Sequence, residues 1–227
     1  MSTINSKTIT QTVTLGAVNS FPTYASPLTI TSTGAILTYA GVGIDGGATG
    51  LGSIDNAGRI RGGNGYNTSA GIVLSAGGDI SNSGVITGGG GYTGAAGIVL
   101  LAGGDISNSG VITGGGGYAG AAGIVLLTGG DISNSGAITG GPGGSDVGNP
   151  GPAGDGILLS GGGSIVNMGA IQGGAGAFYG DGGTGIVLAT GGSIANTGTI
   201  AGGLGGGYRG AAADGAGLVL SAGGVVT

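Results

Sequence analysis

The sequence predicts an all-β protein of one kind, a single-stranded parallel β-helix (β-solenoid), expected to be right-handed with about eight rungs and variable Gly-rich flaps. Three observations support this prediction. A 26-residue unit, GIVLSAGGDISNSGVITGGGGYTGAA, recurs almost unchanged from residue 71 onward. Isoleucines return at fixed places within each unit. Glycine supplies 66 of 227 residues and, from residue 34 onward, interrupts every window of helical length, where each interior Gly costs about 1 kcal/mol relative to Ala.

The N-terminal segment, residues 1–25, differs from the repeats that follow it. Its Ile9, Val13 and Leu15 alternate with threonines, which is typical of half-buried β-strands. The first rung of a solenoid leaves N–H and C=O groups that would recruit other chains unless something covers them. We therefore expect residues 1–25 to form a capping pair of strands, and residues 26–227 to form the solenoid repeats.

The repeats keep one part constant and vary in another. The first isoleucine of the motif lies at residues 30, 54, 80, 106, 132, 165 and 194, and Val225 takes its place in the last motif. Three copies with a period of 26 residues occupy part of 71–148, and the tracts after residue 140 are longer. Such variation indicates insertions in a single loop. Each repeat therefore combines a fixed rung with a variable Gly-rich flap.

The fixed rung is predicted to contain three short strands, with sequences of the type GIVL, GGDISN and GVIT. Strands this short are unstable as hairpins, but stacked rungs can stabilise one another. Parallel strands lie about 4.8 Å apart, so each repeat position would form a column along the rod. The sequence stops at Thr227 inside the last motif, and we expect the chain to be truncated in mid-rung.

Three columns can be listed from the repeat. Two contain isoleucine, typified by Ile80 and Ile86, and each buried aliphatic side chain contributes roughly 1.5–3 kcal/mol. The third is expected to be a ladder in which each Asn side chain donates to the rung above and accepts from the rung below. Its members are Asn56, Asn82, Asn108, Asn134, Asn167 and Asn196, with Ser32 in the leading rung. The glycine that follows, such as Gly84, suits a left-handed corner. A polar binding strip is the alternative interpretation of the Asn column.

The GIVL strand is apolar at every position, as in a strand that is covered on both faces. We expect the flap of the same rung to cover its outer face, and a partner chain is the second possibility. Val73, Val99 and Val125 are therefore candidates for ligand binding or self-association.

The composition excludes several functions. Four Lys and Arg against nine Asp argue against nucleic acid, because phosphate binding needs clustered cations. The absence of Cys and His removes disulfides and thiolate or imidazole metal sites. No stretch approaches the roughly 20 apolar residues of a membrane helix, so no membrane insertion is expected. The first twenty residues lack a continuous apolar run, and no export signal is visible.

Asp79, Asp105 and Asp131 form one column, which we interpret as solvated edge charges. Three carboxylates at rung spacing repel one another unless they are solvated, protonated or bridged, so they are weak candidates for a cation such as calcium. No Lys, His or Glu accompanies them as an acid or base, and we expect no enzyme activity. The GxGxxG spacing inside the flaps lacks the following helix that a dinucleotide requires, so no cofactor is expected.

Tyr66, Tyr92 and Tyr118 also recur every 26 residues, within the flaps. A row of tyrosines can stack on sugar rings or can pin a Gly-rich flap onto the GIVL strand. Pinning is the preferred interpretation.

The segments GGDISNSGVITGG, GGSIVNMGAIQGG and GGSIANTGTIAGG resemble the Gly-rich β-strand repeats of bacterial autotransporter and hemagglutinin-like adhesins and of other large secreted surface proteins. This resemblance runs from about residue 26 to the end. It implies a parallel β-helix, usually right-handed, that is carried on the cell surface or released and that acts in adhesion, matrix formation or biofilm.

We therefore expect an extracellular or cell-surface structural solenoid that acts as a stalk, spacer or matrix component. One alternative is a protomer that stacks end to end into a filament, and another is a carbohydrate-binding or polysaccharide-active β-helix. The expected partners are further copies of the chain, end to end or laterally, a host or matrix surface, or a polysaccharide.

Overall fold

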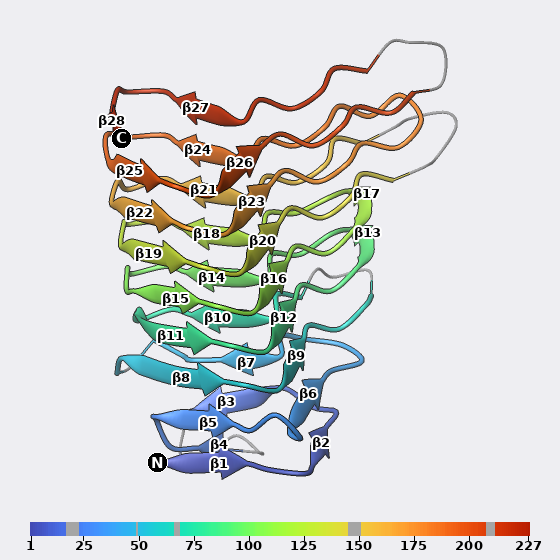
Figure 1. The fold of residues 1–227 in the computed structure, drawn as a ribbon. Helices are drawn as coiled ribbons and strands as arrows, with labels where there is room; N and C mark the ends of the chain where they lie inside the picture. Colours follow the sequence, from blue (N-terminus) through green and yellow to red (C-terminus); the bar gives the residue numbers. More distant parts are fainter. Residues whose placement is uncertain (17–22, 49, 66–68, 145–150, 208–211) are drawn as a thin grey trace.

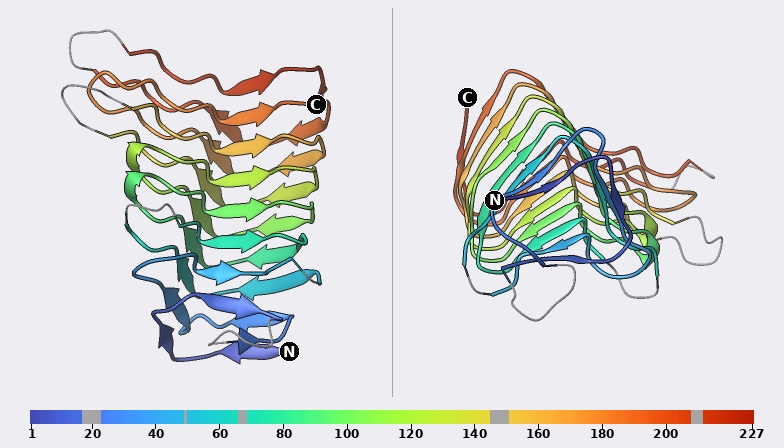
Figure 2. Two further views of the ribbon diagram at one scale, coloured as in Figure 1. Left: turned by 180° about the vertical axis from the view of Figure 1, so that it is seen from behind. Right: turned by 90° about the horizontal axis from the view of Figure 1, so that it is seen from below.

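The computed structural model describes residues 1–16, 23–48, 50–65, 69–144, 151–207 and 212–227. All elements in these ranges are β-strands, and they stack in parallel as a β-solenoid, which confirms the predicted fold class. Figure 1 shows the chain rising rung by rung from β1 to β27, and Figure 2 shows three sides around a central core. Each rung contributes one strand to each of three sheets, here called A, B and C.

Neighbouring strands in each sheet are parallel and pair in register. Sheet A contains β1 (Ser2–Ile4), β5 (Leu28–Ile30), β8 (Gly52–Asn56), β11 (Gly78–Asn82), β15 (Ile106–Asn108), β19 (Asp131–Asn134), β22 (Ser164–Asn167), β25 (Ser193–Asn196) and β28 (Val225–Val226). Sheet B contains β2 (Thr8–Ile9), β6 (Ala35–Leu37), β9 (Arg59–Arg61), β12 (Val85–Thr87), β16 (Val111–Thr113), β20 (Ala137–Thr139), β23 (Ala170–Gln172) and β26 (Thr199–Ala201). Sheet C contains β4 (Thr23–Tyr24), β3 (Val13–Leu15), β7 (Ile44–Asp45), β10 (Ile72–Leu74), β14 (Ile98–Leu100), β18 (Ile124–Leu126), β21 (Ile157–Leu159), β24 (Ile186–Leu188) and β27 (Leu218–Leu220).

The core consists of aliphatic columns from all three sheets. The two predicted isoleucine columns are buried, on sheet A at Ile80 and on sheet B at Ile86. Sheet C adds two more, because Ile72 and Leu74 both point inward and are fully buried, while Val73 between them points outward. The GIVL strand therefore alternates like any strand with one core face. Its continuous apolar sequence does not require a second covering layer.

The N-terminal residues do not form a separate pair of strands. β1, β2 and β3 pair in parallel with β5, β6 and β7, so they are a rung in the same three sheets. Ile9, Val13 and Leu15 are buried, as their alternation with threonine predicts. Only β4 lies beyond this rung, where it pairs with β3 at the edge of sheet C.

The register at the first complete motif differs from the prediction. Leu28, not Ile30, pairs with Ile54, and Ile30 pairs with Asn56. Ile30 thus occupies the inward position that Asn takes in the rungs above, and Ser32 is not a member of the Asn column. The reason is the corner that follows, which is two residues longer between Ile30 and Ile36 than between Asn56 and Ile60.

The last motif is also shifted by one residue. Val226 pairs with Ile194, and Val225 pairs with Ser193, so Val226 rather than Val225 continues the isoleucine column.

The asparagine ladder is present as predicted from Asn56 to Asn196. Each Nδ2 donates to the Oδ1 of the Asn one rung above at 2.7–2.8 Å, and each also donates to the carbonyl of the Gly two residues later. The five lower members are at most 1% exposed. The described residues contain no buried side-chain N or O atom without a partner.

The glycine after each Asn is required for close approach, not for a left-handed conformation. A Cβ on Gly84 would lie 2.1 Å from the carbonyl oxygen of Gly58 in the rung below, and Gly84 has no positive φ. Left-handed glycines occur instead at the corner between sheets C and A, for example Gly77 at φ 80° and Gly78 at φ 141°. There the chain reverses without the steric cost that a side chain would incur.

The flaps form a second ordered structure outside the core. In the unit that begins at residue 71, an outgoing limb (88–90) leaves sheet B and a returning limb (94–97) leads to sheet C. The two limbs hydrogen-bond to each other through Ala95 N–H to Gly89 C=O at 2.9 Å. The outgoing limb of the next rung then bonds to this returning limb through Gly115 N–H to Ala95 C=O at 2.7 Å.

This zigzag continues along the solenoid axis from Ser69 to Gly215. Its hydrogen bonds measure 2.7–3.0 Å, and its backbone members are Ser69, Gly89, Ala95, Gly115, Ala121, Gly141, Gly154, Gly174, Gly183, Gly203 and Gly215. Nearly all are Gly because the limbs pack backbone against backbone. A Cβ on Gly89, Gly115 or Gly141 would lie 2.0 Å from a carbonyl oxygen of the rung below. The Gly-rich tracts are therefore a hydrogen-bonded slab.

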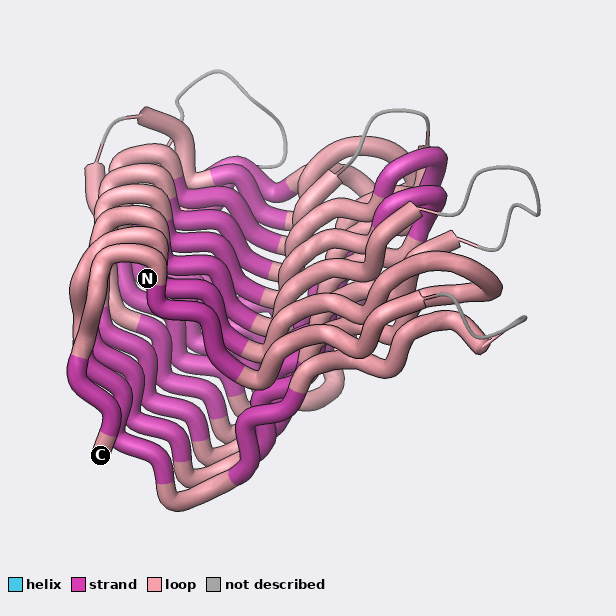
Figure 3. Tube along the Cα trace, turned by 90° about the horizontal axis from the view of Figure 1, so that it is seen from above, coloured by secondary structure: helices cyan, strands magenta, loops and turns pink. Residues whose placement is uncertain are grey.

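The slab does not lie on the outer face of sheet C. Figure 3 shows the flaps standing away from the corner between sheets B and C, and Figure 2 shows the same projection from below. Val73, Val99 and Val125 keep part of their surface exposed. The prediction that the flap covers this column is wrong, because the limbs satisfy their hydrogen bonds with each other.

Candidate functional site

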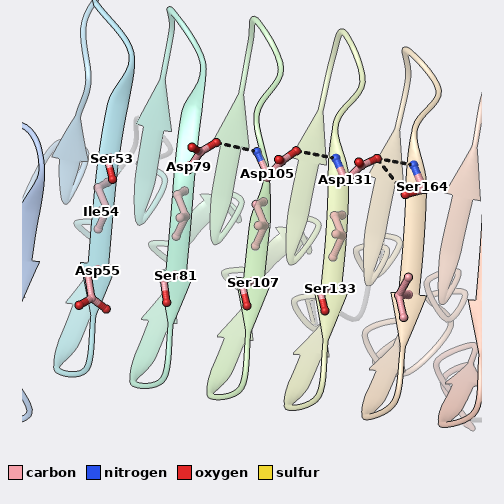
Figure 4. A pocket seen from close by; sticks show the side chains of 14 residues that line it. Ser53, Ile54, Asp55, Asp79, Ser81, Asp105, Ser107, Asp131, Ser133 and Ser164 are labelled. Carbon is pink, nitrogen blue, oxygen red and sulfur yellow. Dashed lines mark hydrogen bonds between the residues drawn. The ribbon is translucent and has the colours of Figure 1, made fainter.

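A groove lies on the outer face of sheet A. It has a volume of about 570 Å³ and extends over strands β8, β11, β15, β19 and β22. Figure 4 shows two rows of outward side chains along it. One row contains Ser53, Asp79, Asp105, Asp131 and Ser164, and the other contains Asp55, Ser81, Ser107, Ser133 and Val166.

The aspartates of this groove bind backbone of the rung above. Asp79 Oδ1 accepts the N–H of Asp105, and Asp105 Oδ1 accepts the N–H of Asp131, each at 3.3 Å. Asp131 Oδ1 accepts both the N–H of Ser164 at 3.1 Å and its hydroxyl at 2.8 Å. All three carboxylates are exposed, as predicted for solvated edge charges. One oxygen of each is thus used structurally, and the other is available to solvent or a ligand.

No group of three or more Asp among the described residues is arranged to hold a metal ion, and the column of Asp79, Asp105 and Asp131 is included in that result. Carboxylates in a straight column at rung spacing of about 4.8 Å do not converge on one point. Cation ligands must surround the ion at about 2.3–2.6 Å, as for calcium. The geometry therefore favours a linear display of charge over a metal centre.

Replacement of Asp105 by Asn should raise the melting temperature at low salt. Asn keeps the Oδ1 acceptor for the N–H of Asp131, and the change removes the repulsion from the carboxylates directly above and below. The gain should shrink in 1 M NaCl, because salt screens exposed charges. Thermal melts at both salt concentrations measure the effect.

Asp55→Asn is the matched control. Asp55 lies on the same face, but its strand neighbours are Thr29 and Ser81, so no carboxylate stands opposite it. The melting temperature of the Asp55→Asn variant should equal that of the wild type. An equal rise in Asp55→Asn, or a fall in Asp105→Asn, would contradict repulsion along the column.

The tyrosines lie at the outer end of the slab. Tyr92 and Tyr118 belong to β13 (Gly91–Thr93) and β17 (Gly117–Ala119), a separate two-stranded sheet. Their rings stack with centroids 5.6 Å apart and an interplanar angle of 10°. Tyr92 is 65% exposed, and both strands stand away from sheet C (Figure 3), so the rings do not pin the flap onto that sheet. Tyr66 lies outside the described residues.

Three aspartates in the later flaps have a role that the sequence analysis missed. Asp155 Oδ1 accepts the N–H of Thr184 at 2.8 Å, and Asp181 Oδ1 accepts the N–H of Ala213 at 2.8 Å. Asp214 Oδ1 accepts the N–H of Gly205 at 2.7 Å. Asp155 and Asp181 each join their flap to the next one, and Asp214 joins the two limbs of its own flap. An Asp near the end of each lengthened Gly tract was the available signal.

Comparisons with known proteins found no match, so the proposed function rests on the fold and on these surfaces. No protein-family model matches the chain, and neither a curated protein nor a solved structure is significantly similar to it. Among the described residues, no helix is long and apolar enough to cross a membrane.

Proposed function

We propose that this protein is an extracellular or cell-surface structural solenoid, an adhesin-like stalk or spacer, and not an enzyme. The observation that supports this best is the continuity of its columns. The isoleucine, asparagine and slab contacts repeat from rung to rung between β8 and β25. In such a protein each rung is stabilised only by its neighbours, so repeats can be added without redesign of the rest.

A spacer should lengthen in proportion to its number of repeats. Insertion of one or two further copies of residues 71–96 should extend the rod by about 4.8 Å per copy, since that is the separation of parallel strands. The pair-distance distribution from small-angle X-ray scattering measures this length. An unchanged maximum dimension, or loss of the folded state on insertion, would contradict the modular rod.

The proposed extracellular or cell-surface location of the protein needs a separate test. An antibody against the exposed Asp and Ser rows of sheet A should label intact cells of the producing organism, as well as permeabilised cells. Labelling that requires permeabilisation would contradict an extracellular role while leaving the rod intact.

The sheet A groove supports a second candidate, the binding of an extended polysaccharide. Its rows offer carboxylate acceptors and serine hydroxyls at the same rung spacing over five strands. Affinity electrophoresis on a panel of neutral and amino-substituted polysaccharides should show retardation that Asp105→Ala with Ser107→Ala abolishes. Thr113→Ala, on the outer face of sheet B, is the control. No retardation by any polysaccharide would remove this candidate.

A further inference from the structure

The outer face of sheet C carries an uninterrupted apolar column. Six successive strands, from β10 to β27, each direct one aliphatic side chain outward. These residues are Val73, Val99, Val125, Leu158, Val187 and Val219. Beside them, Leu101 is 37% and Leu127 is 44% exposed. We call these eight residues the sheet C stripe.

The other two outer faces carry charged and polar side chains. Sheet A presents its Asp and Ser rows, and sheet B mixes Arg59, Arg61 and threonines with the apolar Val85, Val111 and Ala137. The six strands of the stripe, and the two residues after each of them, contain no charged residue. Asp45 in β7 pairs with Val73 and marks the lower limit of the stripe. Among the described strands, sheet C is therefore the face on which an outward apolar side chain recurs over six rungs without a charged neighbour in the strand.

We infer that the sheet C stripe is the surface through which two copies of this chain pair laterally, face to face about a twofold axis. The occupant must present apolar groups that repeat every 4.8 Å or so, and the same stripe of a second copy has this period because it is built from the same rungs. Paired sheets of this kind pack about 10 Å apart with interdigitated side chains.

Charge also favours a second copy on this face. The chain carries a net charge of −5, and the four Asp on the outer face of sheet A would oppose association through that face. The six strands of the stripe contain no Asp or Glu, so contact through sheet C brings no carboxylates of these strands together. In an antiparallel pair the two stripes overlap along their full length. Val125 of one copy then faces Leu158 of the other, and Val99 faces Val187.

The size of the stripe predicts a weak pair. Six rungs span roughly 29 Å, and about five residues of extended chain span roughly 16 Å, which together give about 460 Å² per copy. A stable complex buries about 800 Å² per partner. The pairing should therefore depend on concentration, and it should strengthen when several solenoids are held side by side on one surface.

Sedimentation velocity over a wide range of concentration tests the inference. The weight-average mass of the wild-type protein should rise toward twice that of the single chain. The double variant Val99→Lys with Val125→Lys should weaken pairing at least tenfold, because it places four cations in the interface. Val111→Lys is the matched control, since Val111 is 40% exposed on the outer face of sheet B.

Two further variants guard against misfolding and fix the orientation. Val99→Thr with Val125→Thr keeps β-branched residues in the strands and should weaken pairing less than the lysines do. A mixture of Val125→Lys and Leu158→Asp chains should pair more tightly than either alone, because an antiparallel pair brings these positions together.

Three results would overturn the inference. The wild-type protein could remain a single chain at every concentration. Val111→Lys could weaken pairing as much as the stripe variants do. Association could instead continue beyond two copies as linear, end-to-end assemblies that are insensitive to Val99→Lys with Val125→Lys.

Discussion

Replacement of Asn108 by Ala should lower the free energy of unfolding by roughly 2–4 kcal/mol, because a buried polar group left unpaired costs about 1–3 kcal/mol. Asn108 is 1% exposed and lies in the middle of the ladder. It accepts from Asn82 at 2.8 Å and donates to Asn134 at 2.8 Å. The change leaves the Oδ1 of Asn134 without its donor from below and deprives Asn82 of an acceptor.

Asn108→Asp separates hydrogen bonding from packing. It preserves the shape of the side chain, but a carboxylate oxygen would then face the Oδ1 of Asn134 in a buried position, which is costlier than a missing partner. Burial should raise the pKa of the introduced carboxyl above its unfolded value of about 3.9, so its penalty is full above the folded pKa, shrinks as the pH falls from there, and is lost below about 3.9. The protonated carboxyl can donate as the amide does.

Urea unfolding of these variants at pH 7 and pH 3, each compared with the wild type, measures both effects. Ser107→Ala is the control, since Ser107 is exposed in the same strand and should leave stability unchanged. Equal losses for Ser107→Ala and Asn108→Ala would mean that the ladder contributes nothing specific.

Replacement of Gly115 by Ala should disrupt the slab and lower stability by about 1–3 kcal/mol, the usual cost of forced overpacking. A Cβ at Gly115 would lie 2.0 Å from the carbonyl oxygen of Gly89, which is backbone and cannot move aside. The entropic benefit of Gly→Ala in the unfolded chain is only about 0.4–1 kcal/mol. The steric cost should therefore be the larger effect.

Hydrogen exchange locates this effect. The N–H groups of Ala121 and Gly141 belong to the same zigzag and should exchange faster in Gly115→Ala, whereas the buried core amides should change less. Gly65→Ala is the control, because a Cβ there meets nothing within 4 Å and φ is not positive. That variant should be neutral or slightly more stable. Unchanged exchange in Gly115→Ala would show that the limbs are not tightly packed.

The repeat made most of the fold predictable from sequence. A constant interval between Ile80 and Ile86 specifies two inward columns, and an Asn two residues after the first Ile specifies the ladder. The errors lie where the repeat is imperfect. The longer corner after Ile30 moves that residue into the Asn column, and a one-residue shift places Val226 opposite Ile194.

The candidate surfaces were only partly predictable. The outward column of Asp79, Asp105 and Asp131 follows from strand alternation, but the groove that these residues line with the outward serines was not predicted. From sequence, the Gly tracts were predicted to cover the outer face of the GIVL strand. Gly permits another backbone segment to approach closely, but the sequence does not show which segment that is. The 26-residue spacing of Tyr92 and Tyr118 was recognised, but the rings were predicted to pin the flap onto sheet C, whereas they stack on each other.

The periodicity of the chain thus fixed the solenoid, its inward isoleucines and its amide ladder, because these depend on contacts between equivalent residues one rung apart. The positions of the flaps, the left-handed corner at Gly77 and Gly78, and the exposed sheet C stripe depend on contacts between non-equivalent parts of a rung. A repeat records which residues stack on their own copies. It does not record which of several surfaces a Gly-rich limb will meet, and only the folded backbone resolves that choice through its hydrogen bonds.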